Sequence, residues 1–156
     1  ELELTMTAST ILQDPDLLTT EGLEDVSREE MAEAGLSAFF AIAKEWDLSN
    51  DEARTLLGNP SRSRFYELRR GDPGASHRLS DDELDRLAYI TGIYTALNIL
   101  YTPDSHGEWL RNDSQMPVDA MYRPWGTGSP LGYMLTGKLK ALADVYEYVN
   151  AERGGL

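Results

Sequence analysis

The sequence predicts an all-α fold, and two observations support this prediction. Four serines are each followed three positions later by a glutamate, which is the spacing of a capping box at the start of a helix. After these starts, apolar residues recur at steps of three and four, whereas no segment alternates over the length of a strand. The four pairs are Ser27 and Glu30, Ser49 and Glu52, Ser80 and Glu83, and Ser105 and Glu108.

The first half of the chain is predicted to hold three helices behind an N-terminal arm. Residues 1–26 show no sustained period, so we expect them to form the arm. Gly35 is expected to kink or interrupt the first helix, because glycine weakens a helix interior. Gly58-Asn59-Pro60 should stop the second helix and Gly71 the third, since glycine tolerates a left-handed cap and proline cannot continue a helix. The three helices are expected over 28–46, 50–57 and 62–70.

The second half opens with a long helix over 81–101 that is apolar on more than one face. We therefore expect this helix to be central and mostly buried. A long ordered loop is expected over 111–128, and Ser129-Pro130 has the form of a helix start. A short helix should carry Trp109 and Leu110, and the last helix should place Leu139, Leu142, Val145, Tyr146 and Val149 on one face.

These elements divide the chain into three parts. The stretch 72–76 contains one proline and one glycine, which is typical of a linker between two halves. We predict an arm at 1–26, a helix-turn-helix and dimerisation domain at 27–78, and a partner-binding domain at 79–156.

Composition excludes several classes of protein. The chain has 156 residues and no cysteine, so it has neither disulfides nor thiolate zinc sites. The longest apolar stretch, 93–101, is far shorter than the roughly 18 residues that a membrane span needs. No basic segment followed by an apolar core opens the chain. We therefore expect a cytoplasmic protein with no membrane partner.

The charge is distributed unevenly along an acidic chain. The net charge is −13, yet residues 58–71 hold 4 bases and 1 acid. An acidic protein is a poor general binder of nucleic acid, because its field opposes approach to phosphates. The basic island therefore needs its own explanation.

The basic island lies in a segment, 50–70, that has the size and order of a helix-turn-helix. At about 100° per residue, one face of its second helix collects side chains that suit contacts with phosphates and bases. These candidate DNA-binding residues are Arg62, Tyr66, Arg69 and Arg70. The alternative is a solvated helix face without a ligand.

No catalytic or metal-binding constellation emerges from the sequence. His77 and His106 lack partners at metal-ligand spacing and are expected to face solvent or cap helices. The acids at 81–83 fall in the first turn of a helix, where the helix dipole favours negative charge. Gly126-Thr127-Gly128 departs from a phosphate-binding loop, because position 131 is leucine and no strand precedes it. We therefore predict a protein that is not an enzyme and needs no cofactor or metal.

Two segments of the second half are candidate partner-binding surfaces. The loop 116–125 concentrates side chain types that are enriched at protein interfaces. The chain end is expected to be a flexible tail, released by paired glycines, that could enter a cleft. The candidate residues are Met116, Met121, Tyr122, Arg123 and Trp125 in the loop, and Tyr148, Asn150, Glu152 and Arg153 at the end. The alternative for Met121 and Trp125 is that they fold back into the core.

Self-association is expected through the first half. Phe39, Phe40 and Trp46 are more aromatic surface than so small a unit readily buries alone, so a homodimer would cover them. The alternative is that all three lie in the domain's own core.

The order of several motifs resembles the Xre/MbcA/ParS-type antitoxins, over residues 27–155. The motifs are Ser49-Asn50-Asp51-Glu52-Ala53-Arg54-Thr55-Leu56-Leu57-Gly58, Ser61-Arg62-Ser63-Arg64-Phe65-Tyr66, Trp109-Leu110, the Gly-x-Gly-Ser-Pro-Leu of 126–131 and the segment 137–155. The loop 111–128 looks longer than the turn usual in that family, and the arm is acidic.

The resemblance implies a type II antitoxin with two working halves. Its N-terminal half would dimerise and bind promoter DNA, whereas its C-terminal half would bind a cognate RES-domain toxin and cover the active site. Toxins of this class consume NAD or transfer its ADP-ribose, and the sequence leaves open which. A stand-alone helix-turn-helix transcriptional regulator is the alternative function.

Overall fold

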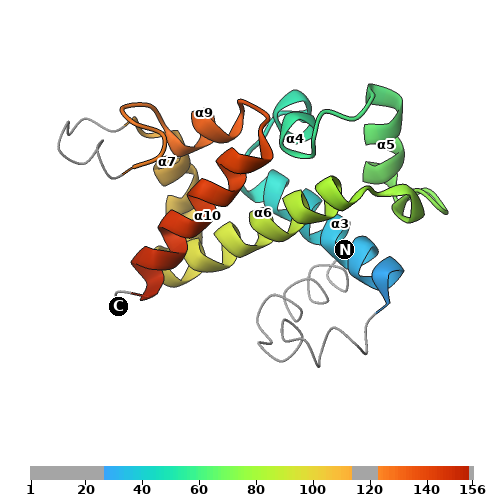
Figure 1. Cartoon of the computed structure of the whole chain (residues 1–156), viewed down its shortest axis with the longest axis horizontal. Coiled ribbons are helices and arrows are strands. Elements are labelled where there is room, and N and C mark those ends of the chain that lie inside the picture. The colour runs from blue at the N-terminus through green and yellow to red at the C-terminus, as the bar shows by residue number, and fades with distance from the viewer. Residues whose placement is uncertain (1–26, 114–122, 155–156) are drawn as a thin grey trace.

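The computed structural model describes residues 27–113 and 123–154, and within these ranges it contains helices and no strand (Figure 1). The predicted all-α fold is therefore confirmed. The helices predicted over 28–46, 50–57, 62–70 and 81–101 each end within one residue of the predicted bound. In order, the elements are α3 (Arg28–Glu45), α4 (Asn50–Leu56), α5 (Arg62–Arg70), η2 (Ser76–Arg78), α6 (Asp81–Leu100), η3 (Pro103–Ser105), α7 (His106–Arg111), α9 (Pro130–Met134) and α10 (Leu139–Gly154).

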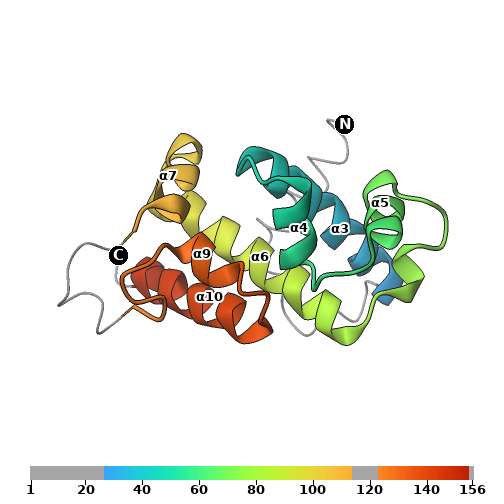
Figure 2. The ribbon, with the colours of Figure 1, turned by 90° about the horizontal axis from the view of Figure 1, so that it is seen from above.

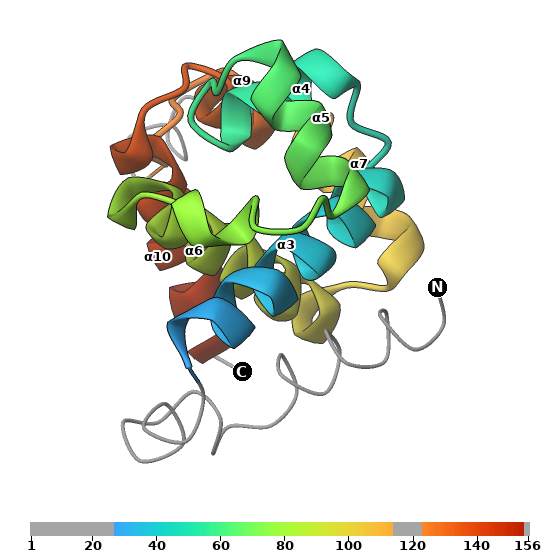
Figure 3. The ribbon, with the colours of Figure 1, turned by 90° about the vertical axis from the view of Figure 1, so that its right-hand side faces the viewer.

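The helix α6 is the central element, as predicted. It passes between α3 and α10 and packs against both (Figure 2). Ile90, Ile93 and Leu97 are at most 1% exposed. Burial on two sides explains why this segment is apolar on more than one face. The helix α5 lies at one end of the molecule, which faces the viewer in Figure 3, and α7 lies toward the other end, with α4 between them (Figures 1 and 2).

Three of the four predicted serine caps are present. The hydroxyls of Ser27, Ser49 and Ser80 each accept a hydrogen bond from the amide three residues on, and the last two form complete capping boxes. The capping box predicted at Ser105 is wrong. This serine ends η3, which runs directly into α7, so its backbone is already helical and not extended as a cap requires. Its hydroxyl bonds Thr102 instead, at 2.9 Å.

Two glycines permit close helix packing. The interruption predicted at Gly35 is wrong, because α3 is continuous there. A Cβ at this position would lie 3.3 Å from a methyl carbon of Leu87, so the glycine allows α3 to approach α6. At the other crossing, a Cβ on Gly92 would lie 2.5 Å from the ring of Tyr146. The lack of a side chain at Gly92 therefore sets the distance between α6 and α10.

The aromatic residues of α3 pack mainly inside the chain. Phe39 and the cap residue Trp46 are at most 1% exposed, so the idea that they need a second copy to cover them is wrong. Side chains of α5 and α6 pack against the aromatic residues of α3. The ring centroids of Phe65 and Phe40 are 5.6 Å apart in an edge-on arrangement, and those of Tyr94 and Trp46 are 6.4 Å apart. Phe40 is half-buried.

In the C-terminal part, the start of α9 agrees with the prediction and the end of α10 does not. Ser129 caps α9 as predicted, accepting from the amide of Gly132 at 3.0 Å. The helix α10 continues to Gly154, so the flexible tail expected from Asn150 onward is wrong for the residues up to 154. Ala151, Glu152 and Arg153 are good helix formers, so they extend the last turn although all three are exposed.

His106 is fully buried, against the expectation that it would face solvent or cap a helix. Its Nδ1 accepts a hydrogen bond from the indole Nε1–H of Trp46 at 3.3 Å. An accepting Nδ1 carries no proton, so this contact requires the neutral ring. Burial lowers the pKa of His106 below its usual 6.5, although the carboxylate of Glu45 opposes the shift. The side chain of His77 lies outside the described residues.

We expect the free energy of unfolding to decrease as the pH falls below about 6.5. Below this pH the ring of His106 binds a proton in the unfolded chain but stays neutral in the folded chain, because folding lowers its pKa. Urea unfolding at two pH values, about 7.5 and about 5.5, measures this loss above the usual carboxylate range. His106→Gln should flatten the difference. An equal pH dependence in wild type and His106→Gln would contradict the assignment.

Candidate functional site

The helix α5 presents the predicted polar face to solvent. Phe65 and Leu68 are at most 2% exposed and face the core, as predicted. Arg62, Tyr66, Arg69 and Arg70 are all exposed, and the exposed fraction of Tyr66 is 38%. The structure therefore brings the four candidate DNA-binding residues together on one helix face.

A tight turn between α4 and α5 places this face. Leu56 and Leu57 are fully buried, and Gly58 and Asn59 both adopt positive φ to reverse the chain. The guanidinium of Arg54 donates to the carbonyl of Pro60 at 2.9 Å and closes the turn. The two helices are thus locked in a helix-turn-helix arrangement.

A largely buried ion pair fixes α5 to the start of α6. Arg64 donates through both of its terminal nitrogens to Glu83, which is 7% exposed, and to the carbonyl of Arg78 at 3.1 Å. Burial alone would raise the pKa of Glu83, but the hydrogen bonds from Arg64 and Ser80 outweigh it and hold the pKa below its usual value. The hydrogen bonds that Arg64 donates to Glu83 raise the pKa of Arg64. Sequence reasoning missed this pair, because nothing in the spacing of residues 64 and 83 indicates a contact.

The exposed arginines of α5 also have partners within the chain. Arg62 lies 3.4 Å from a carboxylate oxygen of Asp51, and Arg70 lies 2.9 Å from one of Asp72. The Asp72 contact raises the pKa of Arg70. Arg69 donates to the side-chain oxygen of Asn50. Three of the four arginines of α5 thus face a carboxylate, which cancels most of the basic island seen in the sequence.

A row of aromatic side chains lies at the other end of the molecule. The ring centroids of Tyr101 and Trp109 are 6.4 Å apart, those of Trp109 and Trp125 are 5.7 Å apart, and those of Trp125 and Tyr148 are 4.9 Å apart. Tyr101 is 41% exposed, and Ile99, two positions earlier in the chain, is 51% exposed. Burial raises the pKa of Tyr101, and the carboxylate of Glu152 adds to the shift. We call the four rings of Tyr101, Trp109, Trp125 and Tyr148 the C-terminal aromatic surface.

The structure places the predicted partner-binding residues in different settings. Trp125 is 9% exposed and packs in the core, which is the alternative weighed for it from the sequence. Arg123 and Tyr148 are half-buried beside it. Asn150, Glu152 and Arg153 are exposed on the last turns of α10. Met116, Met121 and Tyr122 lie outside the described residues. Sequence reasoning missed Ile99 and Tyr101, whose only signal was the apolar end of the long helix. It used Trp109 as a motif of the resemblance and not as a site residue.

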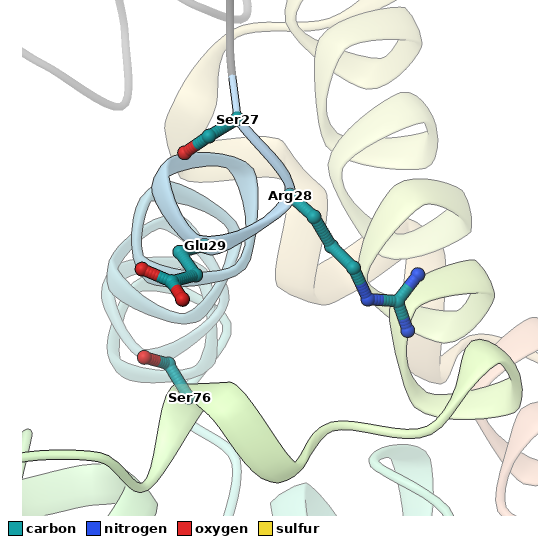
Figure 4. Close-up of a pocket in the computed structure, with 4 residues that line it drawn as sticks. All are labelled: Ser27, Arg28, Glu29 and Ser76. Carbon is teal, nitrogen blue, oxygen red and sulfur yellow. The ribbon is translucent and has the colours of Figure 1, made fainter.

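A hollow at the start of α3 is a weaker candidate for a binding site. Ser27, Arg28, Glu29 and Ser76 line it, and Arg28 extends away from the other three toward α6 (Figure 4). The guanidinium of Arg28 binds Asp81 at 2.9 Å and the carbonyl of Leu79 at 3.3 Å. The guanidinium of Arg28 is therefore already used in contacts that hold α3 against the start of α6.

Comparison with known proteins agrees with this geometry. Residues 25–92, which include α3, α4, α5 and the first part of α6, match the model of the antitoxin Xre-like helix-turn-helix domain. A curated protein of Sinorhizobium fredii, "Uncharacterized protein y4oB", is 35% identical over 123 residues, which cover 78% of this chain and 86% of that protein. This chain belongs to the Xre-type antitoxin family.

As a member of the Xre-type antitoxin family, the chain is an antitoxin or a helix-turn-helix regulator. This antitoxin family is generally non-enzymatic. No helix of the described residues is long and apolar enough to cross a membrane. No solved structure matches the chain significantly. The aromatic surface lies beyond residue 92, outside the match to the helix-turn-helix model.

Proposed function

We propose that this protein is the antitoxin of a type II toxin–antitoxin pair and that it binds and blocks a RES-type toxin acting on NAD. The family supports an antitoxin in general, and the resemblance of the motifs at 49–66, 109–110 and 126–131 supports a toxin of the RES class.

The observation that carries this proposal is the C-terminal aromatic surface. Tyrosine and tryptophan are enriched at the energetic centres of interfaces, and here four of their rings contact one another in a row. Tyr101 and Ile99 are exposed, whereas Trp125 is buried between Trp109 and Tyr148. We propose that the toxin seats on Tyr101 and Ile99.

Charged and polar groups border the C-terminal aromatic surface. Arg123, Asn150, Glu152 and Arg153 lie in the segments beside it, and we propose that they form the rim of the interface, together with Met116, Met121 and Tyr122. A toxin cleft that binds a dinucleotide needs basic groups for the phosphates. The net charge of −13 would accelerate association with such a cleft.

We expect Tyr101→Ala to weaken toxin binding by about 30-fold, or about 2 kcal/mol, because it removes the exposed ring of the aromatic row. The test co-expresses the chain with the toxin of the neighbouring reading frame and measures growth, co-purification and cellular NAD. Tyr66→Ala, an exposed tyrosine on α5, is the matched control and should neutralise like wild type. A combined Ile99→Ala and Tyr101→Ala variant that still co-purifies and restores growth would contradict the proposal.

Promoter binding through α5 is proposed as a second activity. It is favoured by the exposed face that holds Arg62, Tyr66, Arg69 and Arg70 in a helix-turn-helix. If the chain shifts promoter DNA and leaves every toxin unaffected, the alternative of a stand-alone transcriptional regulator replaces the antitoxin.

Homodimerisation through the N-terminal half also remains a proposal. Met31 on α3 is 42% exposed and Phe40 is half-buried, so they replace Phe39 and Trp46 as candidates for such a contact. Sedimentation of the full chain at high concentration tests it, and a monomer would overturn it.

A further inference from the structure

The arginines of α5 differ in the charge of their intramolecular partners. Arg62, Arg64 and Arg70 face the carboxylates of Asp51, Glu83 and Asp72. Arg69 faces the neutral amide of Asn50. A carboxylate at hydrogen-bond distance cancels the field that a phosphate would feel, whereas an amide leaves it intact. Arg69 therefore keeps a full positive charge on the exposed face.

Asn50 is placed to orient this charge. It is the first residue of α4, where Ser49 and Glu52 already satisfy the helix start through a capping box. Its side chain is thus available to reach α5. The Oδ1 atom accepts from Arg69, and Nδ2 donates to the hydroxyl of Tyr66 at 3.4 Å. The assignment of oxygen and nitrogen is consistent, because a guanidinium can only donate.

The same contacts leave donors available for a ligand. Tyr66 and Arg69 are three residues apart on α5 and so share one face. The hydroxyl of Tyr66 accepts from Asn50, which leaves its own hydrogen for an outside acceptor. A guanidinium has five N–H groups, and the bond to Asn50 uses one of them. Phosphate oxygens and guanine edges are acceptors that suit these donors.

We infer that Arg69 is the α5 cation that contacts DNA phosphate and that Asn50 is the residue that positions it, with Tyr66 as the third member of the cluster. This inference rests on the proposed promoter binding. Asp51 and Asp72, in turn, hold Arg62 and Arg70 in pairs that a phosphate would have to displace. The DNA contact is therefore concentrated at the junction between the start of α4 and the middle of α5.

The decisive variant is Asn50→Asp in the full chain. Aspartate has the same shape, favours the start of a helix and still accepts from Arg69, so the fold is kept. It cancels the charge of Arg69, so DNA affinity should fall about tenfold and the salt slope of binding should decrease by about 1. The matched opposite is Asp51→Asn, which frees Arg62 and should raise the affinity and steepen the slope by about 1.

Fluorescence anisotropy measures both variants against two duplexes, the region upstream of the chain's own reading frame and an unrelated sequence, between about 50 and 200 mM salt. A lower DNA affinity of Asn50→Asp together with a higher DNA affinity of Asp51→Asn supports the inference. Wild-type affinity and slope in Asn50→Asp overturn the role of Asn50, and an unchanged Asp51→Asn overturns the cancellation of Arg62. If wild type binds neither duplex, promoter binding fails and this inference fails with it. Circular dichroism and thermal unfolding of the same samples show whether each variant is folded.

Discussion

Replacing Arg86 by alanine is expected to lower the free energy of unfolding by about 3 kcal/mol. Arg86 is buried in α6 and its guanidinium joins three parts of the chain. It binds Asp82 at 2.7 Å, the carbonyl of Gly137 at 2.9 Å and the carbonyl of Leu56 at 3.5 Å. Alanine would leave buried carbonyls without a donor and would open a void beside Gly58, so both halves lose a shared anchor.

Chemical denaturation measures this loss. Arg78→Ala is the matched control, because the side chain of Arg78 is 71% exposed and lies 4.0 Å from Glu67. It should change the free energy of unfolding by no more than about 0.5 kcal/mol. Arg86→Lys keeps the charge but cannot serve three acceptors at once, so it should fall between the two. A loss below about 1 kcal/mol in Arg86→Ala would show that the anchor is dispensable.

Gly92→Ala is expected to lower the free energy of unfolding by about 2 kcal/mol, although alanine is the better helix former. The added methyl would meet the ring of Tyr146 at 2.5 Å, so α10 must move away from α6 or the ring must leave its place. The ring centroids of Tyr146 and Tyr89 are 5.7 Å apart, so a movement of the Tyr146 ring disturbs a second contact. Thermal and urea unfolding of the full chain provide the measurement.

Two comparisons isolate the steric cause. Gly107→Ala, in α7, places its methyl no closer than 3.5 Å to the end of the Arg111 side chain, so it should be neutral or stabilising by up to about 1 kcal/mol. In a Tyr146→Ala background, Gly92→Ala should also become neutral or stabilising, since the clash is gone. A Gly92→Ala penalty that persists in this background would exclude the ring as its cause.

The helices could be predicted from the sequence because their signals are local. Ser49 and Ser80 each sit three residues before a glutamate, and both form the predicted capping box. The same pattern failed at Ser105, where the preceding residues form η3 and remove the extended backbone that a cap needs. The burial of His106 could not be predicted either, because its partner Trp46 lies 60 residues earlier in the chain.

The candidate site was predictable only in part. Helical periodicity placed Arg62, Tyr66 and Arg69 on one face of α5, as the structure has them. Periodicity says nothing about partners, so the neutral amide of Asn50 could not be distinguished from the carboxylates that face the other arginines. At the other end, Trp125 was expected at an interface, yet it is buried and packs against Trp109 and Tyr148.

The length of α6 sets a limit on what one partner can touch. A helix of 20 residues spans about 30 Å. Glu83, near its start, holds α5, and Tyr101 follows its end. A single side chain that a partner inserts at one end is far shorter than this span, so it cannot touch residues at both ends. The residues that contact a partner at the start of α6 and those that contact one beyond its end therefore form separate surfaces on one rigid helix.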